Sequence, residues 1–376
     1  MSGYLQAISN PARQWKPTSG HFDMNGETVR IGVIGVGDIS HCHLSGVQAA
    51  GGDADVRVIA GRRAERVAPL AAQYGIPDIE TDYRAVLARD DIDAVMILTP
   101  ENFHEEIAVA AAEAGKAMMV QKPVAHSVES CKRLIVAAER AGVNMQVSYM
   151  HRYFEEVVYA RDLIRSGKFG EIHAVCMRNA TSGPIMPWNY DPAVVQGGVV
   201  FSLGSHGIDL IQHLVGAVED VSARTATIMR KRTFSNGEVV TDIELEDIAF
   251  ATYRMKNGIL VDHEMSGCEK KGTDRFLVEI HGEKGTLLLR GPRDPLAIYA
   301  PDVTGTSDWH VPDLADRPFG ARHPAHWVDI IRGVLPDEAS GWDSLAGMHV
   351  IQAVYEAAES GSRASVPFLE NADYDQ

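Results

Sequence analysis

Hydrophobic residues in the first 150 positions gather in short continuous runs, each followed by a longer stretch with helical spacing. Runs that do not alternate with polar residues are typical of strands buried on both faces of a sheet. The runs that predict strands are 29–34, 56–60, 94–98, 117–120 and 145–148. Helices are expected after the first run to about residue 50, and over 64–74, 104–114 and 128–141. This alternation predicts an α/β domain with a parallel, doubly wound sheet over residues 29–150.

The pattern changes after residue 150, where longer strand-like segments follow one another with few helices between them. The predicted strands are 172–178, 221–228, 248–255, 259–265, 276–280 and 286–289. Helices are expected at 153–166, 205–215, 325–332 and 344–359. We therefore expect an α+β domain over 151–376, built on a large open, mostly antiparallel sheet. One face of such a sheet packs against helices, and the other is left for a partner subunit.

The first 28 residues are polar, carry prolines and glycines, and show no period. They predict an N-terminal arm, which is either a flexible terminus or a segment laid over a neighbouring subunit. The start of the chain has neither the basic residues nor the apolar core of a secretory signal. The four cysteines are scattered and form no paired motif, which favours a reducing, cytoplasmic location.

The length of 376 residues suits two domains, and no apolar run approaches the roughly 20 residues of a membrane span. The formal net charge of −16 disfavours nucleic acid and anionic membranes as partners. The adjacent His41, Cys42 and His43 point in different directions early in a helix, so no metal site is expected. The expectation of a small-molecule substrate rests on the site motifs and not on composition or charge.

A glycine turn, Gly35-Val36-Gly37-Asp38-Ile39-Ser40, lies between the first strand and the first helix. The first glycine permits a tight turn, and the second lets the backbone approach a pyrophosphate. The third position requires only a small residue, which Ser40 provides. The helix that follows offers its N-terminal N–H groups to phosphate oxygens. We therefore expect a dinucleotide cofactor at Gly35, Gly37, Asp38 and Ile39, the alternative being a glycine-rich turn without a ligand.

The end of the second strand indicates which cofactor this is. Sites for NAD(H) usually carry an acid there for the ribose 2′-hydroxyl, but this chain has Gly61, Arg62 and Arg63. Gly61 leaves room for a 2′-phosphate, and the two arginines could bind it. The sequence slightly favours NADP(H) over NAD(H). The alternative is that both arginines are a solvated helix start.

Polar segments follow two further predicted strands at their carboxyl ends, the edge at which open parallel sheets bind ligands. Near a positively charged nicotinamide the ammonium form of Lys122 is disfavoured, so this residue could act as a general acid or base. The alternative is a surface lysine beside a loop. The candidate cofactor-binding residues of these segments are Thr99, Pro100, Asn102, His104, Gln121 and Lys122.

In the second domain a glycine-rich segment, 197–209, leads into a predicted helix on which His206 and Asp209 share a face. Trp188 lies in a proline-flanked loop, where an aromatic ring suits the apolar face of a sugar. Ordinary packing is the alternative for Tyr149, Arg152 and Trp188. The candidate substrate-binding residues are Tyr149, Arg152, Trp188, Ser202, His206 and Asp209.

Taken together, these motifs resemble the glucose–fructose oxidoreductase / inositol dehydrogenase (Gfo/Idh/MocA) family, over most of the chain from about residue 29 to 367. The order and spacing of the motifs are far more specific than any one of them. They are Gly35-x-Gly37, Thr99-Pro100-x-Asn102-x-His104, Lys122-Pro123, Gly167-x-x-Gly170-Glu171-Ile172, the segment 198–209 and Gly282-Glu283-Lys284-Gly285-Thr286.

The resemblance implies a Rossmann domain with bound NAD(P) and an open-sheet domain through which subunits pair, as a homodimer or homotetramer. It implies hydride transfer between the nicotinamide and a sugar, a cyclic polyol or a related hydroxy or carbonyl compound. By the same resemblance, Lys122 is the acid/base. His206 orients the substrate or shares its proton.

Two positions depart from the family pattern: Gln121 replaces a usual glutamate, and Ser202 replaces a usual aspartate. A serine hydrogen-bonds but carries no charge, so the role of the aspartate does not transfer. The loss of two carboxylates removes attraction for the proton of Lys122, which either keeps this lysine a competent base or marks a changed chemistry. Two alternatives stand beside the dehydrogenase. The resemblance also implies elimination or glycosidic cleavage with a recycled cofactor, and the missing carboxylates leave open a non-catalytic dinucleotide and ligand sensor.

Overall fold

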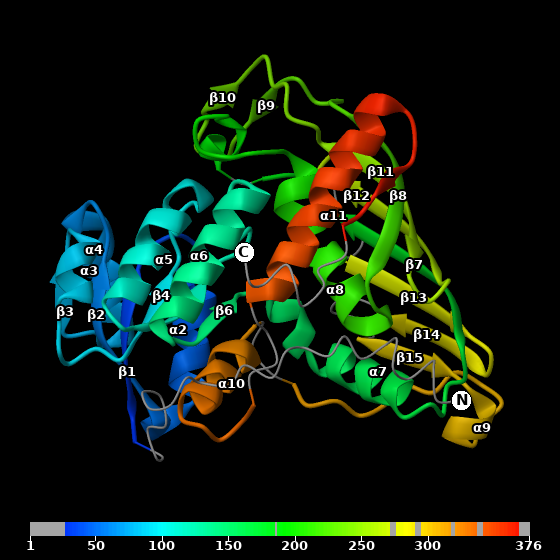
Figure 1. Ribbon diagram of the computed structural model, residues 1–376, viewed down its shortest axis with the longest axis horizontal. Helices are drawn as coiled ribbons and strands as arrows, with labels where there is room; N and C mark the ends of the chain where they lie inside the picture. Colours follow the sequence, from blue (N-terminus) through cyan, green and yellow to red (C-terminus); the bar gives the residue numbers. More distant parts are fainter. Residues whose placement is uncertain are drawn as a thin grey trace. The chain divides into compact units, whose positions relative to one another are not determined.

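The computed structural model describes residues 27–184, 186–270, 276–289, 295–316, 320–336 and 341–367 (Figure 1). These residues form two compact units. The N-terminal unit contains residues up to 154 together with a returning segment between 316 and 345. The C-terminal unit contains the described residues from 155 to 315 and from 346 onward. The predicted N-terminal arm lies outside the described residues, except for its last two positions.

The N-terminal unit is built on a six-stranded sheet with the order β3-β2-β1-β4-β5-β6, and every pairing is parallel. This order is that of the doubly wound dinucleotide-binding fold. The sequence predicted all of these strands except the short, largely polar β3. The strands are β1 (Val29–Ile34), β2 (Ala54–Ala60), β3 (Asp78–Glu80), β4 (Ala94–Ile97), β5 (Ala117–Val120) and β6 (Met145–Val147).

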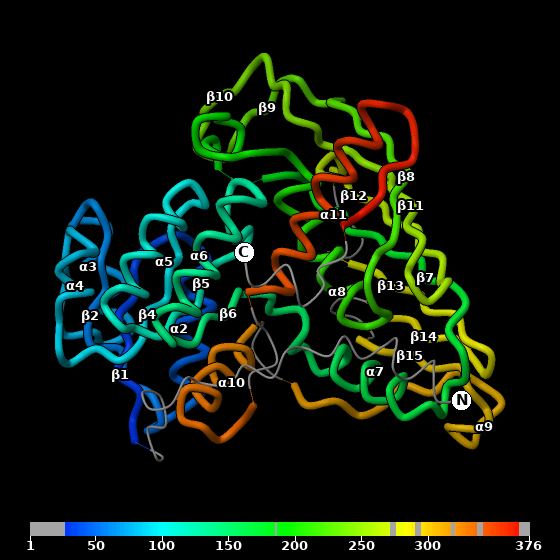
Figure 2. The backbone as a smooth tube through the Cα atoms, viewed as in Figure 1, coloured from blue at the N-terminus to red at the C-terminus, as the bar shows by residue number. Residues whose placement is uncertain are grey.

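Helices cover both faces of this sheet, and Figure 2 follows the chain from β1 to β6 through them. Residues of α2 and α3 share one hydrophobic core with the sheet. Val86 of α4 lies against Gly32 on the opposite face, where α5 packs against both α4 and α6. The helices are α2 (Ile39–Ala49), α3 (Ala64–Tyr74), α4 (Tyr83–Leu87), α5 (His104–Glu113) and α6 (Val128–Ala141).

Local signals set the ends of these helices. The hydroxyl of Ser127 accepts a hydrogen bond from the amide of Ser130 and so caps the start of α6. Gly142 and Gly75, both with a positive φ, end α6 and α3. These signals explain why the predicted limits of 64–74 and 128–141 agree with the structure.

The returning segment contains α10 (Arg322–Ile331), which belongs to the core of the N-terminal unit. Trp327 is fully buried there, and its indole N–H donates to Asn144 at 3.3 Å. Gly46 of α2 lies so close to Pro324 that a β-carbon would be 2.6 Å from its ring. The predicted second domain, 151–376, therefore differs from the C-terminal unit in this segment, which long-range packing assigns to the first.

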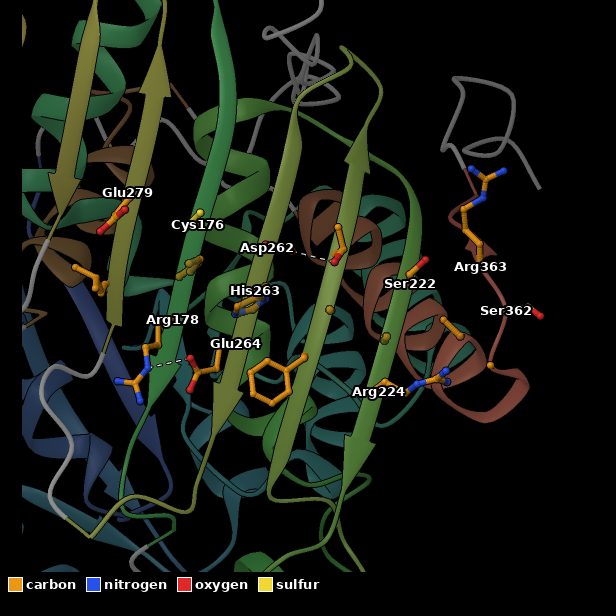
Figure 3. Close-up of a pocket in the computed structure, with 18 residues that line it drawn as sticks. Cys176, Arg178, Ser222, Arg224, Asp262, His263, Glu264, Glu279, Ser362 and Arg363 are labelled. Atoms are coloured by element: carbon orange, nitrogen blue, oxygen red, sulfur yellow. Dashed lines mark hydrogen bonds and ion pairs between the residues drawn. The ribbon is translucent and has the colours of Figure 1, made fainter.

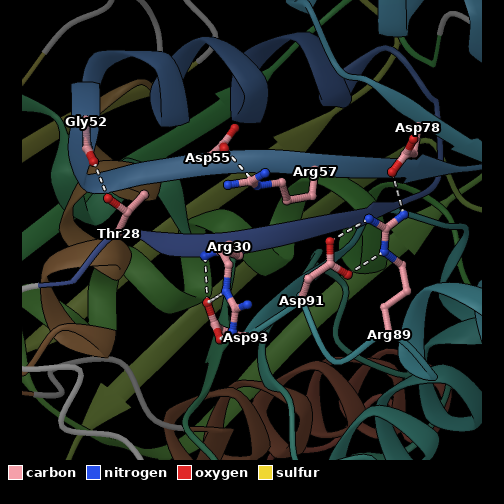
Figure 4. Close-up of polar contacts among 9 residues, drawn as sticks. All are labelled: Thr28, Arg30, Gly52, Asp55, Arg57, Asp78, Arg89, Asp91 and Asp93. Carbon is pink, nitrogen blue, oxygen red and sulfur yellow. Dashed lines mark hydrogen bonds and ion pairs between the residues drawn. The ribbon is translucent and has the colours of Figure 1, made fainter.

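Salt bridges tie down the amino-terminal edge of the same sheet (Figure 4). The guanidinium of Arg30, in β1, binds both carboxylate oxygens of Asp93, just before β4, at 2.6 and 2.9 Å. Arg89 binds Asp91 and Asp78, each at 2.7 Å. Polar contacts thus fix one edge of the sheet, and ligands bind at the opposite edge in this fold.

The C-terminal unit is built on an eight-stranded sheet with the order β15-β14-β13-β7-β12-β11-β8-β16. Every pairing is antiparallel except that of β7 with β12, so the predicted mostly antiparallel sheet is confirmed. A small hairpin of β9 (Arg232–Thr233) and β10 (Val239–Val240) is separate from it. The strands are β7 (Ile172–Ala180), β8 (Val218–Ala226), β11 (Ile248–Met255), β12 (Leu260–Ser266), β13 (Phe276–Gly282), β14 (Gly285–Leu289), β15 (Leu296–Tyr299) and β16 (Ala364–Ser365).

Buried and exposed residues alternate along the central strands, as a sheet covered on one face requires. Helices lie on the covered face in Figure 1, and Phe250 and Leu260 lie more than half exposed. The helices of the unit are α7 (Glu155–Arg165), α8 (Ser205–Val215), the short α9 (Pro301–Thr304) and most of α11 (Gly341–Ser360). Within the described residues, no helix has the length and apolar character needed to cross a bilayer.

Candidate active site

The glycine turn after β1 has the geometry that its sequence predicts. Gly35 has a φ of 111°, and a β-carbon there would lie 2.6 Å from the carbonyl of Leu98, so only glycine fits. The amide of Gly35 donates to the carbonyl of Ala60 at 2.9 Å, which ties the turn to β2. The buried hydroxyl of Ser40 donates to the carbonyl of Gly35 at 3.2 Å. The turn is therefore held from inside the fold.

Gly37 serves a different purpose, because nothing lies within 4 Å of the position that its β-carbon would take. Asp38 beside it is exposed, and its side chain makes no capping hydrogen bond to α2. The first turn of α2 carries no acidic residue, so the exposed Asp38 at the N-cap is the acid nearest to the positive end of this helix. Open space above a helix N-terminus fits the pyrophosphate of a dinucleotide.

The end of β2 presents two exposed arginines. The guanidinium of Arg62 lies over the ring of Phe103, 5.6 Å from its centre, which holds the cation in place. Gly61 packs against Val67 and Val36, with a β-carbon position 3.0 and 3.2 Å from their methyl groups. A side chain at this position would therefore be crowded. The strand end offers positive charge and no carboxylate to a ribose.

His104 links the segment after β4 to the segment after β5. Its Nε2 lies 2.7 Å from the carbonyl oxygen of Thr99, and its Nδ1 lies 3.0 Å from that of Pro123. Burial lowers the pKa of His104 to about 4, so the ring is neutral near pH 7 and donates a single N–H. The single N–H donates to one of these carbonyls, so His104 forms one hydrogen bond at this sheet edge and packs against the other loop. Direct contact with the cofactor stays a prediction.

Gln121 and Lys122 follow β5 at this edge. The side-chain carbonyl of Gln121 accepts the backbone amide of Lys122 at 2.8 Å, so this oxygen fixes the backbone on which the lysine stands. Lys122 itself is partly buried. Since β5 pairs with β4 and β4 with β1, Lys122 lies two strands from the glycine turn, about 10 Å across the sheet.

Two buried oxygens near this edge have no hydrogen-bond partner among the described residues: Oγ1 of Thr99 and Oδ1 of Asn102. Buried polar atoms are normally paired, so an unpaired one calls for an explanation such as a ligand. Both residues belong to the motif that predicts cofactor contacts. The residues of the N-terminal unit therefore fit a bound dinucleotide.

Tyr149 and Arg152, two predicted substrate contacts, are buried after β6. Arg152 pairs with Asp343 of the returning segment at 2.8 Å and lies over the ring of Tyr149 at 5.7 Å. The sequence showed no link between Arg152 and Asp343, which are 191 positions apart. These contacts hold the two side chains within the N-terminal unit, and their contact with substrate stays a prediction.

The glycine-rich segment of the C-terminal unit forms a π-helical turn, Val200–Gly204, that continues into α8. Turns of this kind are rare and often mark functional sites. Ser202 donates its hydroxyl proton to the carbonyl of Gly198 at 2.7 Å within this turn. His206 and Asp209 follow on α8 and are 3% and 2% exposed. Their spacing places both on one face of the helix, as predicted.

A buried hydrogen-bonded chain lies beneath α8 and was not predicted from the sequence. The Tyr253 hydroxyl lies 2.9 Å from Nδ1 of His263, whose Nε2 lies 2.7 Å from Oδ1 of Asn179. Burial lowers the pKa of His263 to about 3 and raises that of Tyr253, so both are neutral. The Tyr253 hydroxyl therefore donates to Nδ1, and Nε2–H donates to Asn179. The alternation of buried and exposed residues along β12 places His263 on the covered face, and this pattern could have revealed its burial from the sequence.

The loop that carries Trp188 is anchored by an arginine. Arg232 donates to the carbonyls of Ser182 and Gly267 at 2.8 and 2.6 Å. Its guanidinium lies 5.6 Å from the ring centre of Tyr190, two residues after Trp188. Trp188 itself is 41% exposed. An exposed tryptophan on an anchored loop is suited to bind a ligand.

The uncovered face of the eight-stranded sheet holds a broad depression of about 690 Å³ (Figure 3). It is lined by side chains of β7, β8, β11, β12 and β13 and by the chain after α11. Figure 3 shows Arg178 beside Glu264, which are 3.0 Å apart. No candidate catalytic or substrate residue lines this depression, so it is separate from the candidate active-site residues.

The structure thus groups the predicted residues in two sets. The glycine turn, the arginines after β2 and Lys122 share one sheet edge of the N-terminal unit. Ser202, His206 and Asp209 share the π turn and α8 of the C-terminal unit. No disulfide joins the four cysteines.

Comparison with known proteins agrees with this architecture. Residues 29–149 match the model of an oxidoreductase family with an NAD-binding Rossmann fold, and residues 157–288 match the GFO/IDH/MocA C-terminal domain. A solved structure of levoglucosan dehydrogenase in complex with NADH superimposes with a TM-score of 0.83. It covers 91% of this chain and all of the other, at 23% sequence identity.

Curated relatives extend over nearly the whole chain. Inositol 2-dehydrogenase 2 of Saccharopolyspora erythraea is 26% identical over 90% of this chain and 96% of its own length. D-apiose dehydrogenase of Paraburkholderia graminis is 26% identical over 90% of each. With both of its domains matched in order, this chain belongs to the Gfo/Idh/MocA family of oxidoreductases with an NAD-binding Rossmann fold.

Proposed function

We propose that this protein transfers hydride between a nicotinamide dinucleotide and a sugar, a cyclic polyol or a related small hydroxy or carbonyl compound. The observation that carries the proposal is the sheet edge that joins an open dinucleotide cradle at Gly37 to Lys122, two strands away. Relatives named as inositol and D-apiose dehydrogenases support the substrate class.

Two groups of residues hold the pyrophosphate and the nicotinamide half of the cofactor. The turn at Gly35 and Gly37 and the start of α2 bind the pyrophosphate. Thr99 and Asn102 offer their unpaired oxygens to the nicotinamide half, on the loop after β4, where His104 contacts the carbonyl of Thr99. When bound, the cofactor supplies the hydride acceptor in oxidation and the hydride donor in reduction.

Arg62 and Arg63 bind the adenosine end, and we propose a preference for NADP(H) over NAD(H). The exposed guanidinium of Arg62, which lies over Phe103, can bind a 2′-phosphate, and β2 ends without the carboxylate that suits a ribose hydroxyl. The solved structure of levoglucosan dehydrogenase contains NADH. A preference for NADP(H) would therefore distinguish this chain from that enzyme.

The proton moves through Lys122. During oxidation of a carbinol, the C–H hydrogen leaves as hydride and Lys122 accepts the hydroxyl proton, which leaves a carbonyl. During reduction Lys122 returns that proton. His206 hydrogen-bonds the same oxygen and so orients the reacting carbon. Ser202 and Asp209 on the same helix, and Trp188, Tyr149 and Arg152, bind the remainder of the substrate.

We also propose that two copies pair through the uncovered sheet face, as a homodimer or a dimer of dimers. Phe250 and Leu260 are 53% and 55% exposed there, and Phe250 lines the depression. A Phe250→Glu variant that remains dimeric in sedimentation experiments would contradict this arrangement. The four cysteines form no disulfide, which supports a cytoplasmic location.

The test is a panel of sugars, cyclic polyols and their keto forms, assayed with NAD(H) and NADP(H) by absorbance at the nicotinamide band. The proposal expects turnover with at least one polyol–cofactor pair. Product formation without a net absorbance change would point instead to elimination or glycosidic cleavage with a recycled cofactor. Cofactor binding without turnover of any compound would point to a sensor.

A further inference from the structure

Glu246, in the segment before β11, accepts hydrogen bonds from the backbone amides at the start of the π turn. Its Oε2 accepts the amide of Gly198 at 3.0 Å, and its Oε1 accepts the amide of Val200 at 3.0 Å. Its backbone carbonyl accepts the amide of Val199 at 2.8 Å. Three consecutive amides thus point to one residue that is 46 or more positions away in the sequence.

Tyr355 of α11 completes this arrangement. Its hydroxyl donates to Oε1 of Glu246 at 2.9 Å. The two glycines at the start of the segment are required by these contacts: a β-carbon at Gly198 would collide with the Glu246 carbonyl, and one at Gly197 with the Tyr355 hydroxyl. The close backbone approach that the glycines predicted is an approach to Glu246 and Tyr355.

The amides at the start of a helix lack partners within it and carry the positive end of the helix dipole. A carboxylate there supplies both acceptors and a complementary charge, and such charge-assisted hydrogen bonds are stronger than neutral ones. The π turn and α8 run on without interruption from this point to Val215. Glu246 therefore holds the end of the helical segment that carries Ser202, His206 and Asp209.

The Glu246 carboxylate takes up a proton, and so loses acceptor capacity, at a higher pH than an ordinary glutamate does. Burial raises the pKa of Glu246 above its ordinary value, although its hydrogen bonds with Val200 and Tyr355 oppose the shift. Tyr355 is the titratable group that faces it from α11, and burial raises the pKa of that phenol too, so Tyr355 stays neutral. The adjacent Asp247 is engaged elsewhere, by the amides of Ile228 and Met229 and by Arg232.

We propose that Glu246, supported by Tyr355, is a positioning residue that fixes the π turn and thereby the placement of His206 for hydride transfer. The inference rests on the proposed function in that His206 is taken to bind substrate. When Glu246 is ionised, the start of the segment is clamped. When Glu246 is protonated, one carboxyl oxygen becomes a donor and its hydrogen bond with a backbone amide of the segment is lost. We therefore expect kcat to fall as the pH is lowered through the pKa of Glu246.

The experiment compares Glu246→Gln, Tyr355→Phe and wild type by the pH profile of kcat. Glu246→Gln removes the charge at nearly constant volume and turns an N–H donor toward the amide of Gly198. We expect kcat to fall about tenfold and the part of the acid limb due to Glu246 to disappear. Tyr355→Phe removes one bond to the carboxylate, so its acid limb moves to higher pH. Cofactor affinity, which depends on the N-terminal unit, stays unchanged in both.

Glu244→Gln is the matched control, because Glu244 is exposed and loses the same charge two residues away. Hydrogen exchange of the amides of 198–204, followed by mass spectrometry, gives a second readout that needs no substrate. We expect about tenfold faster exchange in Glu246→Gln and no change in the control. An unchanged pH profile in an active Glu246→Gln enzyme, or unchanged exchange, overturns the inference. A wild type that turns over no polyol overturns the proposed function, while the exchange arm still tests the clamp.

Discussion

Gly207 of α8 lies directly against His263 of β12, so that a β-carbon on Gly207 would be 2.6 Å from Cε1 of the imidazole. The ring cannot move aside, because Tyr253 and Asn179 hold both of its nitrogens. Consecutive side chains of a helix point about 100° apart. The contact of Gly207 with the sheet therefore also sets the direction in which the His206 side chain points. The depth and rotation of α8 therefore depend on the absence of a side chain at one position.

Gly207→Ala should consequently shift α8 and lower kcat more than it changes cofactor affinity. Overpacking of this kind costs about 1–3 kcal/mol of the free energy of unfolding. Urea unfolding and steady-state kinetics measure the two effects. Gly52→Ala is the control, because its β-carbon would meet nothing within 4 Å. A Gly207→Ala enzyme with wild-type kcat and stability would show that the contact does not position the helix.

Buried neutral histidines make stability depend on pH. Burial lowers the pKa of His43 and His104 to about 4, and of His263 to about 3, from the ordinary 6.5. In the unfolded chain these rings take up protons below about pH 6.5, whereas in the fold they remain neutral. The stability they contribute is therefore complete above pH 6.5 and is lost as the pH falls toward 4, by up to about 1.4 kcal/mol per pH unit for each ring.

Urea unfolding at intervals between pH 7 and pH 4 measures this slope. His263→Gln keeps a polar side chain but removes one titrating group, so its stability should fall less steeply with acid than that of wild type. His281→Gln on β13 is the control, because it makes the same substitution at a side chain that is 42% exposed. Equal slopes in all three proteins would refute a contribution from His263.

Arg62 offers a direct test of cofactor preference. Arg62→Ala should raise the KM for NADPH at least tenfold, because a charge-assisted contact to the 2′-phosphate is lost, and should leave the KM for NADH nearly unchanged. Arg66→Ala, an exposed position four residues further along, is the matched control. Equal effects on both cofactors would mean that Arg62 recognises only the adenine or the shared phosphates.

Much of this architecture follows from local sequence signals. Helix 64–74 ends at Gly75 in both the prediction and the structure, and the turn at Gly35 lies where a strand must pass into a helix. The short β3, with exposed Asp78 and Ile79, has no hydrophobic pattern to reveal it. The sequence did not predict that Trp327 belongs to the core of the N-terminal unit, because its burial depends on residues far away in the sequence.

The same distinction applies to the site. His206 and Asp209 were found because three-residue spacing is a local property of helices. Glu246 and His263 were missed because each acts through residues tens of positions away, Glu246 on Gly198 and His263 on Asn179. Gly198 was recognised as a place of close approach, but the identity of the approaching group required the fold.

The central claim is that Lys122 carries the proton in hydride transfer. We predict that Lys122→Ala lowers kcat by roughly 10²–10⁴-fold, as loss of a general acid/base does, while NAD(P)H binding, followed by fluorescence titration, persists. Lys122→Arg should keep the charge and remain impaired, and Lys132→Ala on α6 should behave as wild type. A Lys122→Ala enzyme that retains wild-type kcat on its best polyol substrate would contradict the account.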